Sequence, residues 1–160
     1  MQKEELLISQ LRPNDASKLS ELFSVIQTDP EAKYFHPHPF SHEHARLISL
    51  YSGKDMYLGA FVNGELIGYG MLRGWEAGYD IPSLGIYISP VYRGNGYAKT
   101  FMLKMHEKAA HKGASQVRLK VYSDNITAVR LYEKMGYVFK GEMKGELVGH
   151  VKLYSNRVES

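Results

Sequence analysis

Residues 84–98, near the middle of the chain, read Leu84-Gly85-Ile86-Tyr87-Ile88-Ser89-Pro90-Val91-Tyr92-Arg93-Gly94-Asn95-Gly96-Tyr97-Ala98. The apolar first part predicts a strand, and the apolar residues that recur after Gly96 predict an amphipathic helix. A short turn between them would point several backbone N–H groups at one spot, at the positive end of the helix dipole. Because Gly94 and Gly96 can take positive φ and carry no Cβ, the turn predicts a phosphate site. The alternative is a strand-to-helix turn whose glycines serve geometry alone.

The residues after this turn continue the alternation of helix and strand. Gln116–Tyr122 alternates apolar and polar side chains, as a half-buried strand does. Asn125 is a candidate N-cap for a second helix, expected from Ile126 to about Met135. Residues 94–98 and Asn125 should then lie near the carboxyl ends of neighbouring strands, where open α/β sheets bind ligands. Because the turn lacks the Gly-x-Gly-x-x-Gly spacing, the dinucleotide-binding fold is a poor fit, and because no Gly-Lys-Ser/Thr follows, a Walker-type phosphate loop is excluded.

Two signatures in these segments resemble the GNAT family of N-acetyltransferases. The family's central signature, Gln/Arg-x-x-Gly-x-Gly/Ala, is matched by Arg93, Gly96 and Ala98. Its later signature is an Asn followed by a helix with Leu-Tyr-x-Lys-x-Gly-Tyr/Phe, matched by Asn125 and residues 131–137 in order and spacing. The strong match runs from about residue 84 to residue 139.

The resemblance implies an α/β (α+β) fold with a mixed, mostly antiparallel central sheet of about seven strands. Helices lie on both faces, and the sheet is splayed between its fourth and fifth strands. The front half of the chain is compatible with this order of elements. It predicts a strand at Leu6–Leu11, helices near Ala16–Ile26 and from Ser41 to about Tyr51, an irregular segment at Gln27–Phe40, and a hairpin of Met56–Val62 with Glu65–Arg73 across Asn63-Gly64.

Composition sets broad limits on the class of protein. A chain of 160 residues predicts one domain, 1–160, and 44% hydrophobic with 23% charged residues is typical of soluble globular proteins. No apolar run reaches membrane-spanning length, and Met1–Glu5 contains no signal-peptide apolar region. The absence of cysteine excludes disulfides, thiolate nucleophiles and Cys-ligated metals. The net charge of +3 suits an anionic cofactor without predicting nucleic acid, and a cytoplasmic enzyme is the expectation.

The resemblance implies that acetyl-CoA is the cosubstrate, and no metal is predicted. Backbone N–H groups of residues 93–98 would hold the pyrophosphate, and backbone groups of Ile86 and Ile88 would pair with the pantetheine arm like an added strand. Asn125 would hydrogen-bond the arm. The predicted cofactor-binding set is Ile86, Tyr87, Ile88, Arg93, Gly94, Asn95, Gly96, Tyr97, Ala98, Lys99, Asn125 and Tyr132.

The catalytic residues are predicted in part from the family. Tyr132 occupies the position of the family's usual general acid, which protonates the departing thiolate. Its place on the apolar face of its helix also suits a core tyrosine. The position at the start of the cofactor strand where many members carry a base is occupied here by Pro82-Ser83-Leu84, which cannot titrate. Asp80 is therefore the predicted base, with Glu76 in the same loop as the second candidate.

The acceptor side is predicted from two aromatic segments. His36, His38, His42 and His44 stand close together in sequence, but the prolines between them and their spacing argue against a zinc site. An acceptor-pocket loop and a loop of solvated histidines both remain open. Trp75, Tyr79 and Phe35 could form an apolar wall of the pocket, or close one end of the core. The predicted substrate-binding set is Phe35, His36, His38, Trp75 and Tyr79.

The predicted reaction is direct acetyl transfer from acetyl-CoA to a primary amine of a small molecule, such as an amino sugar or polyamine, without an acyl-enzyme. The alternatives are a CoA-binding sensor without catalysis, an enzyme that acetylates a protein or peptide N-terminus, and an acyltransferase with a longer acyl donor. Neither nucleic acid nor a membrane is a predicted partner. Dimerisation is common in the family, but no feature of this sequence decides it.

Overall fold

The computed structural model describes residues 5–154, so most of the segment Met1–Glu5 lies outside the described residues. One seven-stranded sheet is formed by β1 (Leu6–Gln10), β2 (Met56–Val62), β3 (Glu65–Arg73), β4 (Ser83–Ile88), β5 (Gln116–Tyr122), β6 (Val138–Met143) and β7 (Glu146–Lys152). The helices are α1 (Ala16–Thr28), α2 (His42–Ser49), α3 (Tyr97–His111) and α4 (Ile126–Lys134). Short 3₁₀ turns occupy η1 (Pro13–Asp15), η2 (Pro30–Tyr34) and η3 (Pro90–Tyr92).

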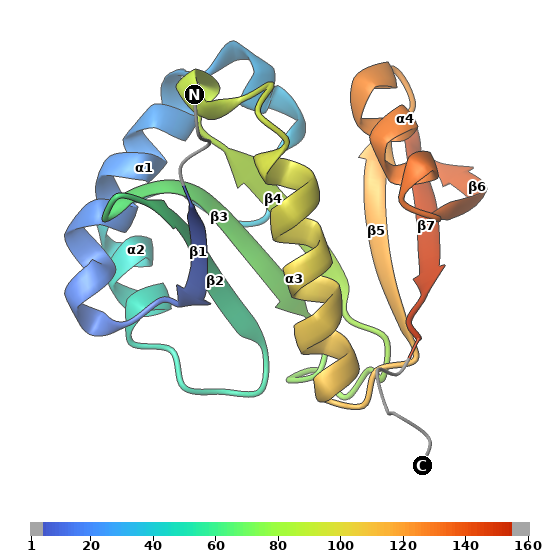
Figure 1. Cartoon of the computed structure of the whole chain (residues 1–160), viewed down its shortest axis with the longest axis horizontal. Helices are drawn as coiled ribbons and strands as arrows, with labels where there is room; N and C mark the ends of the chain where they lie inside the picture. The colour runs from blue at the N-terminus through green and yellow to red at the C-terminus, as the bar shows by residue number, and fades with distance from the viewer. Residues whose placement is uncertain (1–4, 155–160) are drawn as a thin grey trace.

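The sheet has the strand order β1-β2-β3-β4-β5-β7-β6, and β4 and β5 are its parallel neighbours. Across the described parts of these two strands, one register pair joins them, Ser83 with Arg118. Beyond that pair the strands diverge toward their carboxyl ends, and Figure 1 shows β5, β7 and β6 standing apart from β1–β4. The mixed, mostly antiparallel sheet with a splay between its fourth and fifth strands is confirmed.

Each face of the sheet carries its own helical layer. Helices α3 and α4 pack on one face, over a core that includes Leu84 and Val121. Helices α1 and α2 pack on the other face, over side chains such as Tyr69 and Tyr87. Within residues 5–154 this second core draws on β2, β3 and β4 but on no residue of β5, β6 or β7. Half of that face of the sheet is therefore left without a helical cover.

The predicted elements agree closely with the observed ones because strong local signals mark their ends. Ser41 caps α2 by accepting a hydrogen bond from the His44 N–H at 3.0 Å, and this helix ends at Ser49 rather than at Tyr51. The β2–β3 hairpin turns at Asn63-Gly64, whose positive φ angles of 51° and 79° match a two-residue hairpin turn. The segment expected to be irregular contains η2, begun by Asp29 and Pro30. No helix within the described residues is long and apolar enough to cross a membrane.

Candidate functional site

A cleft of about 980 Å³ opens where β4 and β5 diverge. It is reached from both layers of the molecule, because α3 and α4 border it on one face of the sheet and η2 borders it on the other. Its lining residues include Tyr34, Phe35, Leu84, Ile86, Tyr87, Ile88, Arg93, Gly94, Gly96, Tyr97, Ala98, Lys99, Lys120, Tyr122, Asn125 and Tyr132. Most of the predicted cofactor-binding set is thus gathered around one cavity.

The first turn of α3 opens onto this cleft without a side-chain cap. Its N-cap is Gly96, with φ 77°, which has no side chain that could accept a hydrogen bond from the helix. Helices α2 and α4, in contrast, are capped by side chains. Gly94 also has a positive φ of 79°, and a Cβ placed there would meet no atom within 4 Å. Glycine is therefore needed there for the backbone conformation rather than for space. An uncapped helix start with positive partial charge is a site for an anion such as a diphosphate.

The edge of β4 supplies backbone groups along the cleft. The Ser89 N–H donates to the Ile67 carbonyl at 2.8 Å, so these two residues form a hydrogen-bonded pair of the β3–β4 ladder. In an antiparallel pair only every second residue bonds to its neighbour, so the backbone groups of Ile86 and Ile88 point away from β3, toward the gap. The Ile88 carbonyl already accepts a hydrogen bond from Arg93 Nε at 3.0 Å. An extended ligand could pair with the remaining groups as a strand would.

The Arg93 side chain points away from the anion site at the start of α3, toward η2 on the other face of the sheet. Its guanidinium donates to Asp29 at 2.6 Å and to Glu31 at 2.7 Å. Asp29, whose side chain is only 3% exposed, also accepts from the Tyr87 hydroxyl at 2.7 Å. Burial alone would raise the pKa of Asp29, but these donors outweigh it and lower its pKa below the ordinary value. This Asp29–Arg93 clamp ties η2 to the turn before α3.

Asn125 acts as the N-cap of α4 while lining the cleft. Its side-chain oxygen accepts a hydrogen bond from the Ala128 N–H at 3.4 Å. With that oxygen engaged, the amide nitrogen is the atom through which Asn125 could donate to a ligand in the cleft. The residue's position after β5 therefore leaves its amide nitrogen available while its oxygen caps the helix.

Tyr132 lines the cleft from α4 and packs against a buried aromatic neighbour. Its ring lies 5.9 Å from that of Tyr137, which is 3% exposed and shares a 2.7 Å hydrogen bond with His106 Nε2. Burial raises the pKa of Tyr132 to about 12. The phenol therefore carries its proton throughout the neutral range and can donate it to a group in the cleft.

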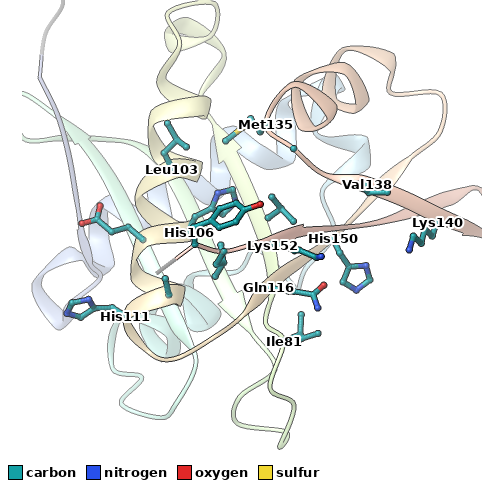
Figure 2. Close-up of a pocket in the computed structure, with 16 residues that line it drawn as sticks. Ile81, Leu103, His106, His111, Gln116, Met135, Val138, Lys140, His150 and Lys152 are labelled. Carbon is teal, nitrogen blue, oxygen red and sulfur yellow. The ribbon is translucent and has the colours of Figure 1, made fainter. Parts of the chain in front are cut away.

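His106 borders a second hollow, of about 1410 Å³, between α3 and the strands β6 and β7. Figure 2 shows Leu103, His106 and His111 on α3 at one side of this hollow, and Val138, Lys140 and His150 from β6 and β7 at the other. None of the residues around it belongs to the predicted catalytic or cofactor-binding sets. The hollow behind α3 is therefore separate from the candidate site.

The protonation of His106 gives a prediction about stability. Burial lowers the pKa of His106 from 6.5 to about 4, so the unfolded chain binds a proton more readily than the folded one between these values. The stability that depends on neutral His106 is thus complete above pH 6.5 and is lost as the pH falls toward 4. We expect His106→Asn to flatten this part of the plot of Tm against pH in calorimetry. The exposed His111, on the same helix, provides the control: His111→Asn should leave the slope unchanged, and equal slopes for both variants would contradict the assignment.

The predicted acceptor residues are distributed between the cleft and the α1/α2 core. Phe35 lines the cleft and stacks on Tyr87, with ring centroids 5.7 Å apart. His38 instead lies among core aromatic side chains: its Nδ1 donates to the Pro39 carbonyl at 2.7 Å, and its Nε2 bonds to Tyr69 at 2.8 Å. His36 is exposed and does not line the cleft.

The histidine cluster is only partly brought together. The rings of His38 and His44 stack with centroids 4.3 Å apart, whereas His42 bonds to Ser20 on α1. Among residues 5–154, no group of three or more His, Cys, Asp or Glu side chains could hold a metal ion. Burial lowers the pKa of His38 to about 4, which keeps this ring neutral within the core.

The loop between β3 and β4 lies at the other end of β4 from the anion site. Trp75 packs under α3, with Lys112 Nζ 4.3 Å from its ring centre, and Tyr79 is 68% exposed. The Glu76 carboxylate accepts a hydrogen bond from Tyr51 at 3.4 Å, and Asp80 is exposed. The structure does not bring Glu76, Asp80, Trp75 or Tyr79 into the lining of the cleft.

Three residues of the site were missed by sequence reasoning. Asp29 carries the clamp, Tyr34 contacts Tyr122 across the cleft with ring centroids 5.4 Å apart, and Tyr137 backs the ring of Tyr132. Tyr137 belongs to the quoted Leu-Tyr-x-Lys-x-Gly-Tyr segment and could have been included with Tyr132. Asp29 and Tyr34 lie in a segment without periodicity, so no local signal marked them.

Comparison with known proteins agrees with this geometry. The profile of the acetyltransferase (GNAT) family matches residues 19–137. The thialysine N-epsilon-acetyltransferase of Mus musculus is 31% identical over 144 residues, covering 82% of this chain and 83% of that protein. An acetyltransferase of Pectobacterium atrosepticum is 33% identical over 83 residues, covering 52% of this chain and 57% of that protein.

Solved structures share the fold. A GNAT-family acetyltransferase from Streptococcus pneumoniae superimposes with a TM-score of 0.79 at 23% identity, covering 94% of this chain and 100% of that one. The PaiA N-acetyltransferase of Thermoplasma acidophilum, in complex with coenzyme A, gives 0.73 at 21% identity, covering 92% and 99%. With two sequence signatures, the splayed sheet and a family profile spanning most of its length, this chain belongs to the GNAT family and is an acetyl-CoA-dependent N-acetyltransferase.

Proposed function

We propose that this enzyme acetylates the primary amine of a small molecule, such as an amino sugar or a polyamine, by direct transfer without an acyl-enzyme. The observation that carries the proposal is a cleft open to both layers of the fold. The uncapped start of α3 and the β4 edge border it on one side, and the aromatic rings of Tyr34 and Phe35 border it on the other. A donor and an acceptor could therefore meet between β4 and β5.

The chain's own groups can hold the donor in this cleft. The Arg93 N–H already donates to the Pro90 carbonyl at 3.2 Å, but the N–H groups of residues 94–98 suit the donor's diphosphate, with Lys99 adding positive charge. The backbone of Ile86 and Ile88 suits the amides of the donor's arm. The Asn125 side chain suits a further hydrogen bond to the arm. Acetyl-CoA supplies an activated acetyl group as a thioester.

In the overall reaction an N–C amide bond forms and the C–S bond breaks. The amine loses one proton and the sulfur gains one, so the products are an acetamide and free CoA thiol. We assign Tyr132 as the acid that gives the proton to sulfur, because its phenol lines the cleft and stays protonated at neutral pH. The acceptor of the amine proton stays a prediction: Asp80 and Glu76 lie beyond the amino end of β4, so either would have to act through water or after a loop movement.

Two named relatives support a small amine as acceptor. The mouse relative is named for acetylating thialysine, and a structural neighbour with a TM-score of 0.76 at 18% identity is a chimera of spermidine N-acetyltransferases. Thialysine and spermidine are both small molecules with primary amines. Whether the chain works as a homodimer stays a prediction.

The proposal is tested by measuring thiol release from acetyl-CoA with a panel of amino sugars, polyamines, amino acids and peptides. We expect release that requires a small amine and yields one acetamide per thiol, as counted by mass spectrometry. Release with peptides alone would contradict the small-molecule acceptor. Tight CoA binding by calorimetry, without release for any amine, would contradict catalysis and favour a sensor.

A further inference from the structure

The half of the sheet left uncovered by α1 and α2 carries a concentration of positive charge. On β5 and β7 the buried side chains Val117, Leu119 and Val151 face α3, so the residues between them face the opposite side. The register places Arg118 opposite His150 and Gln116 opposite Lys152, with Lys120 two residues further along β5. We call this surface, made of Arg118, Lys120, His150 and Lys152, the basic face; Figure 2 shows His150 and Lys152 near Gln116.

The charges of the basic face are not neutralised within the described part of the chain. The ion pairs found among residues 5–154 join Arg46 to Glu43, Arg93 to Asp29 and Glu31, and Lys104 to Glu107. None of them includes a residue of the basic face. One carboxylate, Glu146, shares this side of the two strands, opposite Tyr122 at their far end. Adjacent unpaired cations repel one another, and an anionic ligand would relieve that cost.

The basic face meets the cleft at its Lys120 end, whereas His150 and Lys152 at its other end border the second hollow. Lys120 and Tyr122 line the cleft, and Tyr122 contacts Tyr34 of η2. Arg118 donates a hydrogen bond to the Ser83 hydroxyl at 3.3 Å, at the one register pair from which β4 and β5 diverge. A molecule entering the cleft from the η2 side therefore passes beside these cations.

We propose that the basic face binds a negatively charged group on the acceptor, so that the preferred substrate is a small amine that also carries a carboxylate or a phosphate. This inference rests on the proposed function and narrows its substrate class. The strand geometry sets the size of the acceptor: residues two apart on a strand are separated by about 7 Å, and neighbouring strands by about 5 Å. An amine in the cleft and an anion on Arg118 or Lys120 are thus within the span of one small molecule.

The test compares matched pairs of amines in which one member carries the anion. Cadaverine with lysine tests a carboxylate, and ethanolamine with O-phosphoethanolamine and glucosamine with glucosamine 6-phosphate test a phosphate. We expect kcat/KM from thiol release to favour the anionic member of at least one pair by about tenfold or more, a preference that decreases as salt is added. Equal or higher kcat/KM for the member without the anion in every pair, or acetylation restricted to acidic peptides, would overturn the inference.

Substitutions on the basic face test whether its residues cause the preference for anionic amines. Arg118→Gln and Lys120→Gln should each reduce several-fold the ratio of kcat/KM between the members with the anion and the members without it. Lys104→Gln removes an exposed cation on α3 and should leave the ratio unchanged. A ratio that stays at the wild-type value in the double Arg118→Gln, Lys120→Gln variant would overturn the inference. If no amine of either kind releases thiol, the proposed function itself fails, whereas transfer only to amines that lack an anionic group rejects just the narrower inference.

Discussion

Tyr132→Phe is expected to lower kcat for acetyl transfer by about 10²-fold or more, because a positioned general acid typically contributes 10²–10⁴-fold. The dissociation constant for acetyl-CoA should stay within about twofold, since the substitution keeps the ring and the binding groups on β4 and α3 are backbone atoms. Loss of kcat without loss of donor affinity is the signature of a group that acts on the reacting atoms. Single-turnover thiol release and calorimetry with CoA measure the two quantities separately.

A matched control distinguishes this role from a general effect of removing a phenol. Tyr57→Phe removes a hydroxyl from the α1/α2 layer, where the Tyr57 ring packs against Tyr51 at 5.0 Å, away from the cleft. We expect it to retain wild-type kcat. Unchanged kcat in Tyr132→Phe would show that the phenol is only a core residue and that another group or water protonates the thiolate.

Gly94→Val is expected to weaken CoA binding by about 10²-fold or more. A β-branched residue is strained at the φ of 79° that this turn requires, and relaxation of the turn would redirect the N–H groups before α3. Each tenfold loss of affinity corresponds to about 1.4 kcal/mol, so strain of the size known for such positions accounts for the effect. Calorimetric titration with CoA and with acetyl-CoA provides the measurement.

Gly113→Val is the control for strain alone. Gly113 follows the other end of α3 with φ 93°, and a Cβ there would also meet no atom within 4 Å. Both variants should lose similar stability, but only Gly94→Val should lose cofactor affinity. Equal CoA binding by the two variants would contradict the anion site at the start of α3.

The donor half of the site could be predicted because contiguous segments build it. Residues 84–98 contain the strand edge, the glycine turn and the helix start in succession, and Asn125 and Tyr132 belong to one capped helix. Backbone atoms perform most of the proposed binding there, so the conformation that the local sequence favours is nearly sufficient to form the donor half of the site. The observed β5, Gln116–Tyr122, has the predicted bounds for the same reason.

The acceptor half depends on contacts between distant segments and could not be predicted in the same way. Asp29 meets Arg93 only after the α1/α2 layer has folded onto β4. The pairing of Arg118 with His150 depends on β7 lying between β5 and β6, an order that no local pattern indicates. The aromatic loop after β3 was expected beside the acceptor, but tertiary packing places Trp75 against Lys112 at the C-terminal end of α3.

The Asp29–Arg93 clamp couples the donor half of the cleft to its acceptor half. Arg93 holds η2 through two carboxylates while its own backbone forms part of the turn that would receive the diphosphate. A donor that immobilises this turn thereby immobilises Tyr34 and Phe35, and the second substrate then loses less entropy on arrival. We therefore expect the cosubstrates to bind with positive cooperativity, the coenzyme entering first, and we expect this order to depend on the buried carboxylate of Asp29.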